Sequence, residues 1–153
     1  MKTKGIRILD KNGRTVSVEL ADILKEIPNG NEFFWSILVF DAQGKIKNGK
    51  SNDDLERESS SEQGSLLTWK ELNDFAMENI VIIDLIVIGC KDKSDIKRYN
   101  TEREMYESYD YYIDKFDTSY WEIFSKDEQW INQLATKFKD VKFLESDFLE
   151  KNE

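Results

Sequence analysis

The sequence predicts an α+β fold: a mixed, mostly antiparallel sheet packed with about three to four helices. Two long apolar runs, 33–40 (FFWSILVF) and 81–89 (VIIDLIVIG), have the aromatic and β-branched residues typical of strands that are covered on both faces. Amphipathic helical patterns alternate with these runs, and 153 residues are enough for one domain with its own core.

The N-terminal part predicts a hairpin followed by a short helix. Alternating stretches at 6–9 and 15–18 flank Asn12-Gly13, which is a strong signal for a tight turn between two strands. Apolar residues then recur at helical spacing, at Leu20, Ile23, Leu24 and Ile27. Pro28 ends this helix, because proline restricts the residue before it to extended conformations.

Two segments are expected to lack packed structure within the single domain that spans 1–153. Residues 44–65 are rich in glycine, serine, asparagine and charge and have almost no apolar residues, which predicts a long mobile loop. Residues 146–153 are expected to form a frayed tail.

The second half of the chain contains two helices with capping-box spacing. Thr68 and Glu71 open a helix over 68–79, and Ser125 and Glu128 open another over 125–140. Strands are predicted on both sides of the second helix, at 120–124 and 141–145.

Asp84 is the one polar residue inside the apolar run 81–89. A carboxylate in such a run is expected at a strand end or against a backbone or arginine partner, because an unpaired buried charge is costly.

Composition disfavours several classes of function. The net charge is −9, which disfavours direct binding to nucleic acid or to an anionic membrane, since both attract cationic surfaces. The chain has no histidine and no nucleotide-binding or zinc motif, so we expect neither enzymatic activity nor a cofactor or metal. Its single cysteine, Cys90, is expected to be a buried small hydrophobic residue. The N-terminus lacks a signal peptide pattern, and no apolar run is long enough to span a bilayer, so the expected compartment is the cytoplasm.

Residues 106–117 (YESYDYYIDKFD) are the most unusual segment. All six tyrosines lie between Tyr99 and Tyr120, where six acidic residues outnumber two basic ones. The spacing of Thr101 and Glu104 favours a helix, whereas alternation over 110–116 favours a strand, and both readings place Asp110 and Asp114 on one side.

Tyrosine and carboxylate together suit recognition of a basic protein surface. The predicted partner-binding residues are Glu107, Tyr109, Asp110, Tyr111, Tyr112, Asp114 and Asp117. The alternative is that the tyrosines pack over the core while the carboxylates face water.

The small acidic α+β chain, its lack of histidine and its ending YWEIFSKDEQWINQLATKFKDVKFLES resemble the immunity proteins that protect bacteria from their own polymorphic or contact-dependent toxins. The resemblance implies a cytoplasmic, non-catalytic inhibitor that binds one cognate toxin domain, for example a basic nuclease. The resemblance does not identify any functional residues in this chain, because no specific family motif is present.

Two other functions remain open at this point. The carboxylates could imitate nucleic-acid phosphates and block DNA-binding proteins in general, which predicts several partners and a steep salt dependence. Alternatively, the chain could be a carboxylate-dependent enzyme or small-ligand domain in which Asp84 or the strand 33–40 lines a pocket.

Overall fold

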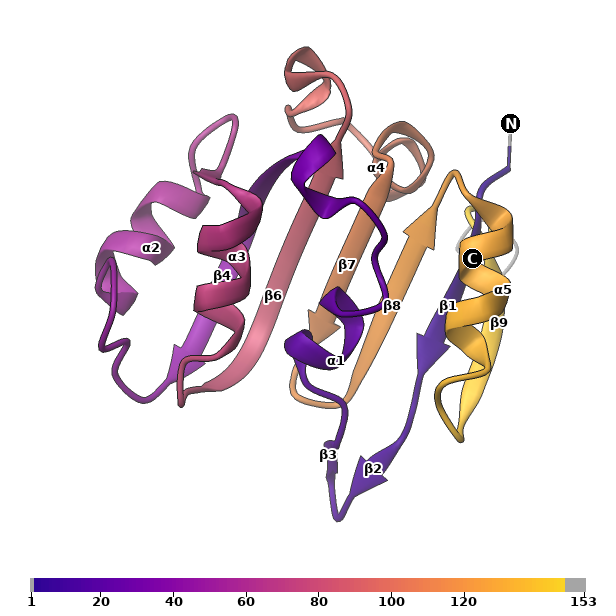
Figure 1. Cartoon of the computed structure of the whole chain (residues 1–153), viewed down its shortest axis with the longest axis horizontal. Coiled ribbons are helices and arrows are strands. Elements are labelled where there is room, and N and C mark those ends of the chain that lie inside the picture. Colours follow the sequence, from indigo (N-terminus) through magenta and orange to yellow (C-terminus); the bar gives the residue numbers. More distant parts are fainter. Residues whose placement is uncertain (1, 148–153) are drawn as a thin grey trace.

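The computed structural model describes residues 2–147 and contains a seven-stranded sheet with helices on both faces (Figure 1). The strand order is β5-β4-β6-β7-β8-β1-β9, and every neighbouring pair is antiparallel. The predicted α+β fold with a mostly antiparallel sheet is therefore confirmed. The strands are β1 (Lys4–Ile8), β4 (Phe34–Gln43), β5 (Ser65–Leu67), β6 (Val81–Cys90), β7 (Tyr111–Phe116), β8 (Tyr120–Ser125) and β9 (Val141–Glu145).

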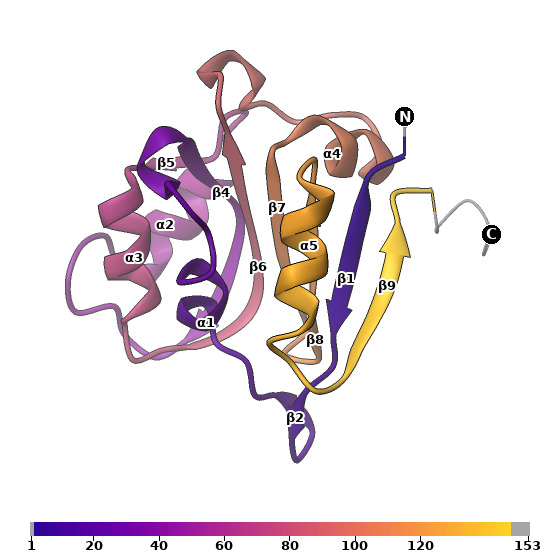
Figure 2. The ribbon, with the colours of Figure 1, turned by 45° about the vertical axis from the view of Figure 1, so that its right-hand side comes forward.

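The face turned toward the viewer in Figure 1, here called the front face, carries the larger core. The helices α1 (Leu20–Leu24), α3 (Trp69–Ala76) and α5 (Glu128–Ala135) lie on it (Figures 1 and 2). Their buried apolar side chains pack against inward-facing residues of the sheet such as Ile6, Val87 and Ile113. A short 3-10 turn, η1 (Gly30–Glu32), leads into β4 on the same side.

The opposite face, here called the back face, is only partly covered. The helix α4 (Glu102–Ser108) lies behind the upper end of the sheet, preceded by the 3-10 turn η2 (Lys93–Asp95) (Figures 1 and 2). A smaller core forms beneath this segment and includes Ile88, Ile96 and Phe124. Cys90 belongs to it and is fully buried, as the sequence predicts.

Most strands and helices lie where the sequence places them. β4 and β6 are the two long apolar runs, and β9 has the predicted bounds 141–145. Thr68 and Glu71 make the predicted capping box at the start of α3: the Glu71 backbone N–H donates to Thr68 Oγ1 (3.1 Å), and the Thr68 N–H donates to Glu71 Oε1 (2.9 Å).

The predicted N-terminal hairpin is wrong in extent. The turn at Asn12-Gly13 joins only two short strands, β2 (Lys11–Asn12) and β3 (Thr15–Val16). β1 instead pairs with β8 on one side and β9 on the other. Its apolar residues Ile6 and Ile8 are fully buried in that position, an outcome that a local turn signal cannot reveal.

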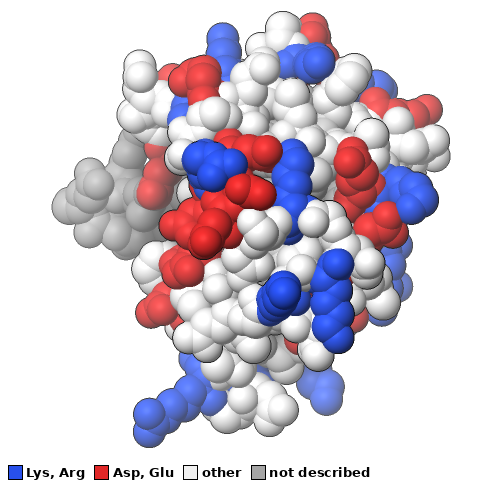
Figure 3. Space-filling model, turned by 90° about the vertical axis from the view of Figure 1, so that its left-hand side faces the viewer, with Lys and Arg blue, Asp and Glu red and all other residues white. Residues whose placement is uncertain are grey.

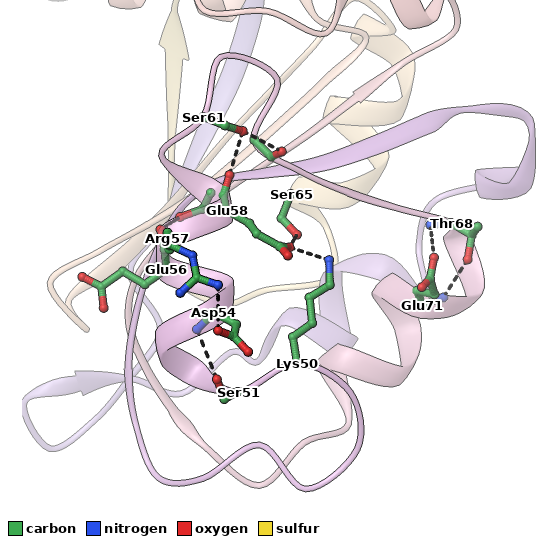
Figure 4. A network of polar contacts seen from close by, with 12 residues as sticks. Lys50, Ser51, Asp54, Glu56, Arg57, Glu58, Ser61, Ser65, Thr68 and Glu71 are labelled. Atoms are coloured by element: carbon green, nitrogen blue, oxygen red, sulfur yellow. Dashed lines mark hydrogen bonds and ion pairs between the residues drawn. The ribbon is translucent and has the colours of Figure 1, made fainter.

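The segment 44–65, predicted to be a loop without packed structure, contains the helix α2 (Asn52–Ser59) and leads into β5. Ser51 caps α2 by accepting a hydrogen bond from the Asp54 N–H (3.2 Å), and Glu58 accepts one from Ser65 and pairs with Lys50 (Figure 4). One apolar side chain of α2, Leu55, is buried in the larger core. A helix with a single buried apolar residue has too weak a periodicity to stand out in the sequence.

Two details near the C-terminus also differ from prediction. α5 begins at Glu128 and is capped by Asp127, because Ser125 is the last residue of β8 and its hydroxyl donates to the Asp110 carbonyl (2.8 Å). Of the predicted tail 146–153, Ser146 and Asp147 are buried, and the remaining residues lie outside the described part of the chain.

Candidate functional site: an acidic groove on the back face

The tyrosine-rich segment is both a helix and a strand. α4 begins after Thr101, whose hydroxyl accepts a hydrogen bond from the Glu104 N–H (3.1 Å), and ends at Ser108. β7 follows at Tyr111 and is the middle strand of the seven. The helical pattern that begins at Thr101 is therefore correct for residues 102–108, and the strand pattern is correct for residues 111–116.

The three predicted contact tyrosines are buried, so the expectation that their rings lie on the surface is corrected. Tyr109 is 0%, Tyr111 5% and Tyr112 2% exposed. Tyr111 faces the front core, where its ring lies 5.6 Å from Trp35 and 5.0 Å from Trp130, while Tyr109 and Tyr112 belong to the back core. Tyr111 and Tyr112 are buried because β7 is the central strand and is covered on both faces over its first half. Tyr109 lies just before β7, and its hydroxyl donates to the Lys97 carbonyl (2.5 Å).

The predicted carboxylates do not form one surface either. Glu107 accepts a hydrogen bond from the Ser146 hydroxyl, and Asp110 accepts one from the Lys91 N–H (2.7 Å). Asp117 is exposed in the turn between β7 and β8, with a left-handed backbone (φ 47°). Asp114 lines a cavity on the back face.

This cavity, here called the back-face groove, has a volume of about 530 Å³. It lies on β4, β6 and β7, between α4 and α2. Five carboxylates line it: Asp41, Asp84 and Asp114 on the sheet, Glu102 on α4 and Glu56 on α2. Apolar side chains lie among them, namely Val39, Ile86, Met105 and Phe116. Seen from the side of α2, Asp and Glu side chains gather in a band beside Lys and Arg side chains (Figure 3).

The strand register places like charges opposite each other on this face. Asp41 pairs with Asp84 across β4 and β6, and Asp114 pairs with Glu122 across β7 and β8. Directly opposed like charges destabilise a sheet. Among the described residues that line the groove, Lys115 is the one basic residue, and its ammonium lies 5.6 Å from the centre of the Trp121 ring, which belongs to the front core. It therefore does not neutralise these carboxylates.

The surroundings of Asp114 in the groove shift its pKa. Burial, together with the negative charges of Glu122, Glu102 and Asp84, raises the pKa of Asp114 to about 7. The Tyr112 hydroxyl, which donates to Asp114 Oδ2 at 2.9 Å, acts in the opposite direction by stabilising the ionised form. A cation in the groove would lower this pKa, because it would favour the charged carboxylate.

Asp84 has the kind of partner that the sequence predicts. Its Oδ1 accepts a hydrogen bond from the backbone N–H of Asp117 (2.8 Å), which ties the β7–β8 turn to β6. Asp84 also lines the groove, so it belongs to the candidate site even though it accepts a hydrogen bond from Asp117.

Beside the groove, an arginine stacks on an aromatic ring. The Arg7 guanidinium lies 4.6 Å from the centre of the Tyr120 ring, and it donates to Glu122 Oε2 from Nε (2.8 Å) and Nη2 (2.5 Å). The Phe116 ring stacks on Tyr120 with centres 5.5 Å apart. Phe116 is 53% exposed, so an apolar ring borders the acidic groove.

A second hollow, of about 570 Å³, lies between α3 and the segment that includes α2. Its floor is apolar and includes Ile37 of β4 and Phe75 of α3. The carboxylates at its rim serve local structure: Glu71 caps α3, Asp74 pairs with Lys70, and Glu78 accepts hydrogen bonds from the loop before α2. This hollow therefore offers less free charge for recognition than the back-face groove.

Of the groove residues, the sequence singles out Asp114, Tyr112 and Asp84, and the strand 33–40 that it offers as a pocket lining contributes Val39 and Phe40. It does not single out Asp41, Glu56, Glu102 or Phe116. These four residues lie on β4, α2, α4 and β7, and the tertiary fold brings them together at the groove. The one available signal was local: Asp114 and Phe116 alternate on one face of the same strand.

Comparisons with known proteins give no relative. No protein-family model matches the chain, and neither the curated proteins nor the solved structures contain a match. Within residues 2–147, no helix has the length and apolar character to cross a membrane, and no group of three or more acidic or cysteine side chains is arranged to hold a metal ion.

Proposed function

We propose that the chain is a non-catalytic, protein-binding inhibitor that receives a basic segment of its partner in the back-face groove. One observation carries this proposal: carboxylates on β4, β6 and β7 converge on an open cavity in which no described basic side chain neutralises them. The apolar residues among them, including the exposed Phe116, supply the contact area that a protein interface needs.

The partner class that we propose is a cognate toxin domain, for example a basic nuclease. The resemblance to immunity proteins supports this class, and so does the net charge of −9, which accelerates encounter with a basic protein through long-range attraction. The contact surface differs from the one that the sequence favours, since carboxylates of the sheet replace the buried tyrosines.

The test uses the purified product of the gene next to the one that encodes this chain. Its affinity is measured by calorimetry for the native chain and for a variant with Asp41→Asn, Asp84→Asn and Asp114→Asn. We expect the variant to bind at least about 100-fold more weakly, because buried charged contacts contribute about 1–3 kcal/mol each.

The matched control carries Asp53→Asn, Asp92→Asn and Asp140→Asn, three exposed aspartates outside the groove. It changes the net charge equally and should retain native affinity. Equal loss in both triple variants would show that only net charge matters, and no loss in either would remove the groove from the interface. Binding of several unrelated DNA-binding proteins with a steep salt dependence would identify a nucleic-acid mimic instead.

A further inference from the structure

We infer that the back-face groove contains a binding site for a guanidinium group, formed by Asp114, Asp84 and the ring of Phe116, and that an arginine of the partner occupies it. This inference rests on the proposed function and specifies which side chain of the partner enters the groove. It follows from a repeated arrangement on the back face, in which one copy already holds an arginine.

The occupied copy is on β8. Tyr120 and Glu122 are two residues apart on this strand, so both side chains point to the back face. Arg7, opposite Glu122 in the register with β1, places its guanidinium against the Tyr120 ring and donates two hydrogen bonds to the Glu122 carboxylate. On this sheet, a ring and a carboxylate at this spacing thus contact the guanidinium of a residue from the neighbouring strand.

The second copy lies beside it on β7. Phe116 is the register partner of Tyr120, and Asp114 is the register partner of Glu122. Phe116 and Asp114 therefore repeat the ring and the carboxylate in the same positions one strand away. On the far side of β7, the register partner of Asp114 is Ile86, so β6 supplies no cation that corresponds to Arg7.

The surroundings of this second copy fit a guanidinium. One face of the Phe116 ring stacks on Tyr120, and the residue is 53% exposed and lines the groove. On the β6 side, Asp84 adds a second carboxylate that lines the same cavity. Its Oδ1 accepts one hydrogen bond from the Asp117 N–H, which leaves acceptor capacity on the carboxylate.

A guanidinium suits these groups better than an ammonium does. It is planar, so it can stack on the Phe116 ring while its edge donates to carboxylates in the plane, and it is weakly hydrated. An ammonium is a strongly hydrated point charge that gains less from a ring face in a narrow groove. The occupant would also supply the counter-charge that Asp114 lacks among its neighbours, which are the Tyr112 hydroxyl and the carboxylates of Glu122, Glu102 and Asp84.

The experiment titrates the ¹⁵N-labelled full chain with three capped tripeptides, Gly-Arg-Gly, Gly-Lys-Gly and Gly-citrulline-Gly, and follows amide and Phe116 ring signals by NMR. We expect the arginine peptide to shift signals of β7 and β6 around the groove. Its affinity should exceed that of the lysine peptide by about two- to fivefold, the range of a single cation–ring contact. Citrulline, which has nearly the shape of arginine without its charge, should give no saturable shift.

Two variants with matched controls define the site. Phe116→Leu should reduce the preference for arginine over lysine to below about twofold, whereas Phe143→Leu, which changes a ring of similar exposure (57%) on β9, should leave it unchanged. Asp114→Asn should weaken both peptides, and Asp140→Asn should not. Amide spectra of each variant report whether the fold is intact.

The outcomes separate this inference from the proposed function. Equal binding of the arginine and lysine peptides in the groove would refute the guanidinium site and leave a general cation-binding groove. Shifts that map outside the groove, or none for either cationic peptide, would contradict the guanidinium site. If the partner itself still required the groove aspartates, the proposed function would stand without it.

Discussion

Replacement of Asp114 by asparagine should stabilise the fold, and the gain should depend on pH. The carboxylate lies against three other carboxylates, and its hydrogen-bond donor is the Tyr112 hydroxyl. Asparagine is nearly isosteric and can accept the same hydrogen bond through Oδ1. The substitution therefore removes mainly the charge.

The size of the effect follows from the pKa. The pKa of Asp114 rises from an ordinary value of 3.8 to about 7. At about 1.36 kcal/mol for each pKa unit, ionised Asp114 costs the folded state up to about 4 kcal/mol, and partial solvation reduces this to about 2–4 kcal/mol. Between these two pH values the folded chain keeps a proton that the unfolded chain has released. Stability therefore falls as the pH rises through this interval and levels off above about 7.

Urea unfolding at a series of pH values from about 4 to 8 measures this effect. The stability difference between the Asp114→Asn variant and the native chain should grow by about 2–4 kcal/mol across the series. Asp140→Asn, which changes an exposed aspartate outside the groove, is the matched control. A difference that stays constant for Asp114→Asn, or a carboxyl ¹³C titration with a midpoint near 4, would refute the reasoning.

Three further predictions concern other parts of the fold. Leu55→Ala should lower the free energy of unfolding by about 2–4 kcal/mol in urea, because the side chain is buried in the larger core; a change below about 0.5 kcal/mol would contradict a packed α2. Arg98→Ala should lower the free energy of unfolding in urea by about 1–3 kcal/mol, since Nη2 donates to the carbonyls of Leu38 and Ser59 and Nε to that of Ser61. The amides of α2 should also exchange faster in this variant, and exchange as slow as in the native chain would contradict the prediction. Thr118→Gly should raise the thermal midpoint, with a gain of about 0.5–1 kcal/mol, because Thr118 has a left-handed backbone (φ 57°) that a β-branched residue disfavours; a lower midpoint would contradict this.

Sequence reasoning succeeded where the signal was local and strong. The runs that became β4 and β6 are continuous enough to predict buried strands, and the spacing of Thr68 and Glu71 predicts the start of α3. It failed where the outcome depends on distant partners. β1 pairs with strands more than a hundred residues away, so its position in the sheet could not be read from the Asn12-Gly13 turn beside it.

The candidate site shows the same division. The sequence favours a surface role for the tyrosines next to Asp114, yet β7 is the central strand and they are buried. On β7, Tyr111 and Ile113 pack in the front core, whereas Asp114 and Phe116, toward the other end of the strand, line the groove on the back face. Tyr112 and Asp114 share the back face and both line the groove, but the Tyr112 ring packs against Tyr106 of α4, with ring centres 5.0 Å apart, and is buried. Only the path of the chain after β6 decides this, and no local pattern encodes it.

The most direct measurement is hydrogen–deuterium exchange of this chain alone and in complex with the proposed partner. If the partner enters the back-face groove, amides of residues 82–86 and 113–117 should exchange more slowly in the complex, and those of α1, α3 and α5 on the front face should be unchanged. Protection confined to the front helices, with the strands around Asp84 and Asp114 unaffected, would contradict the proposed interface.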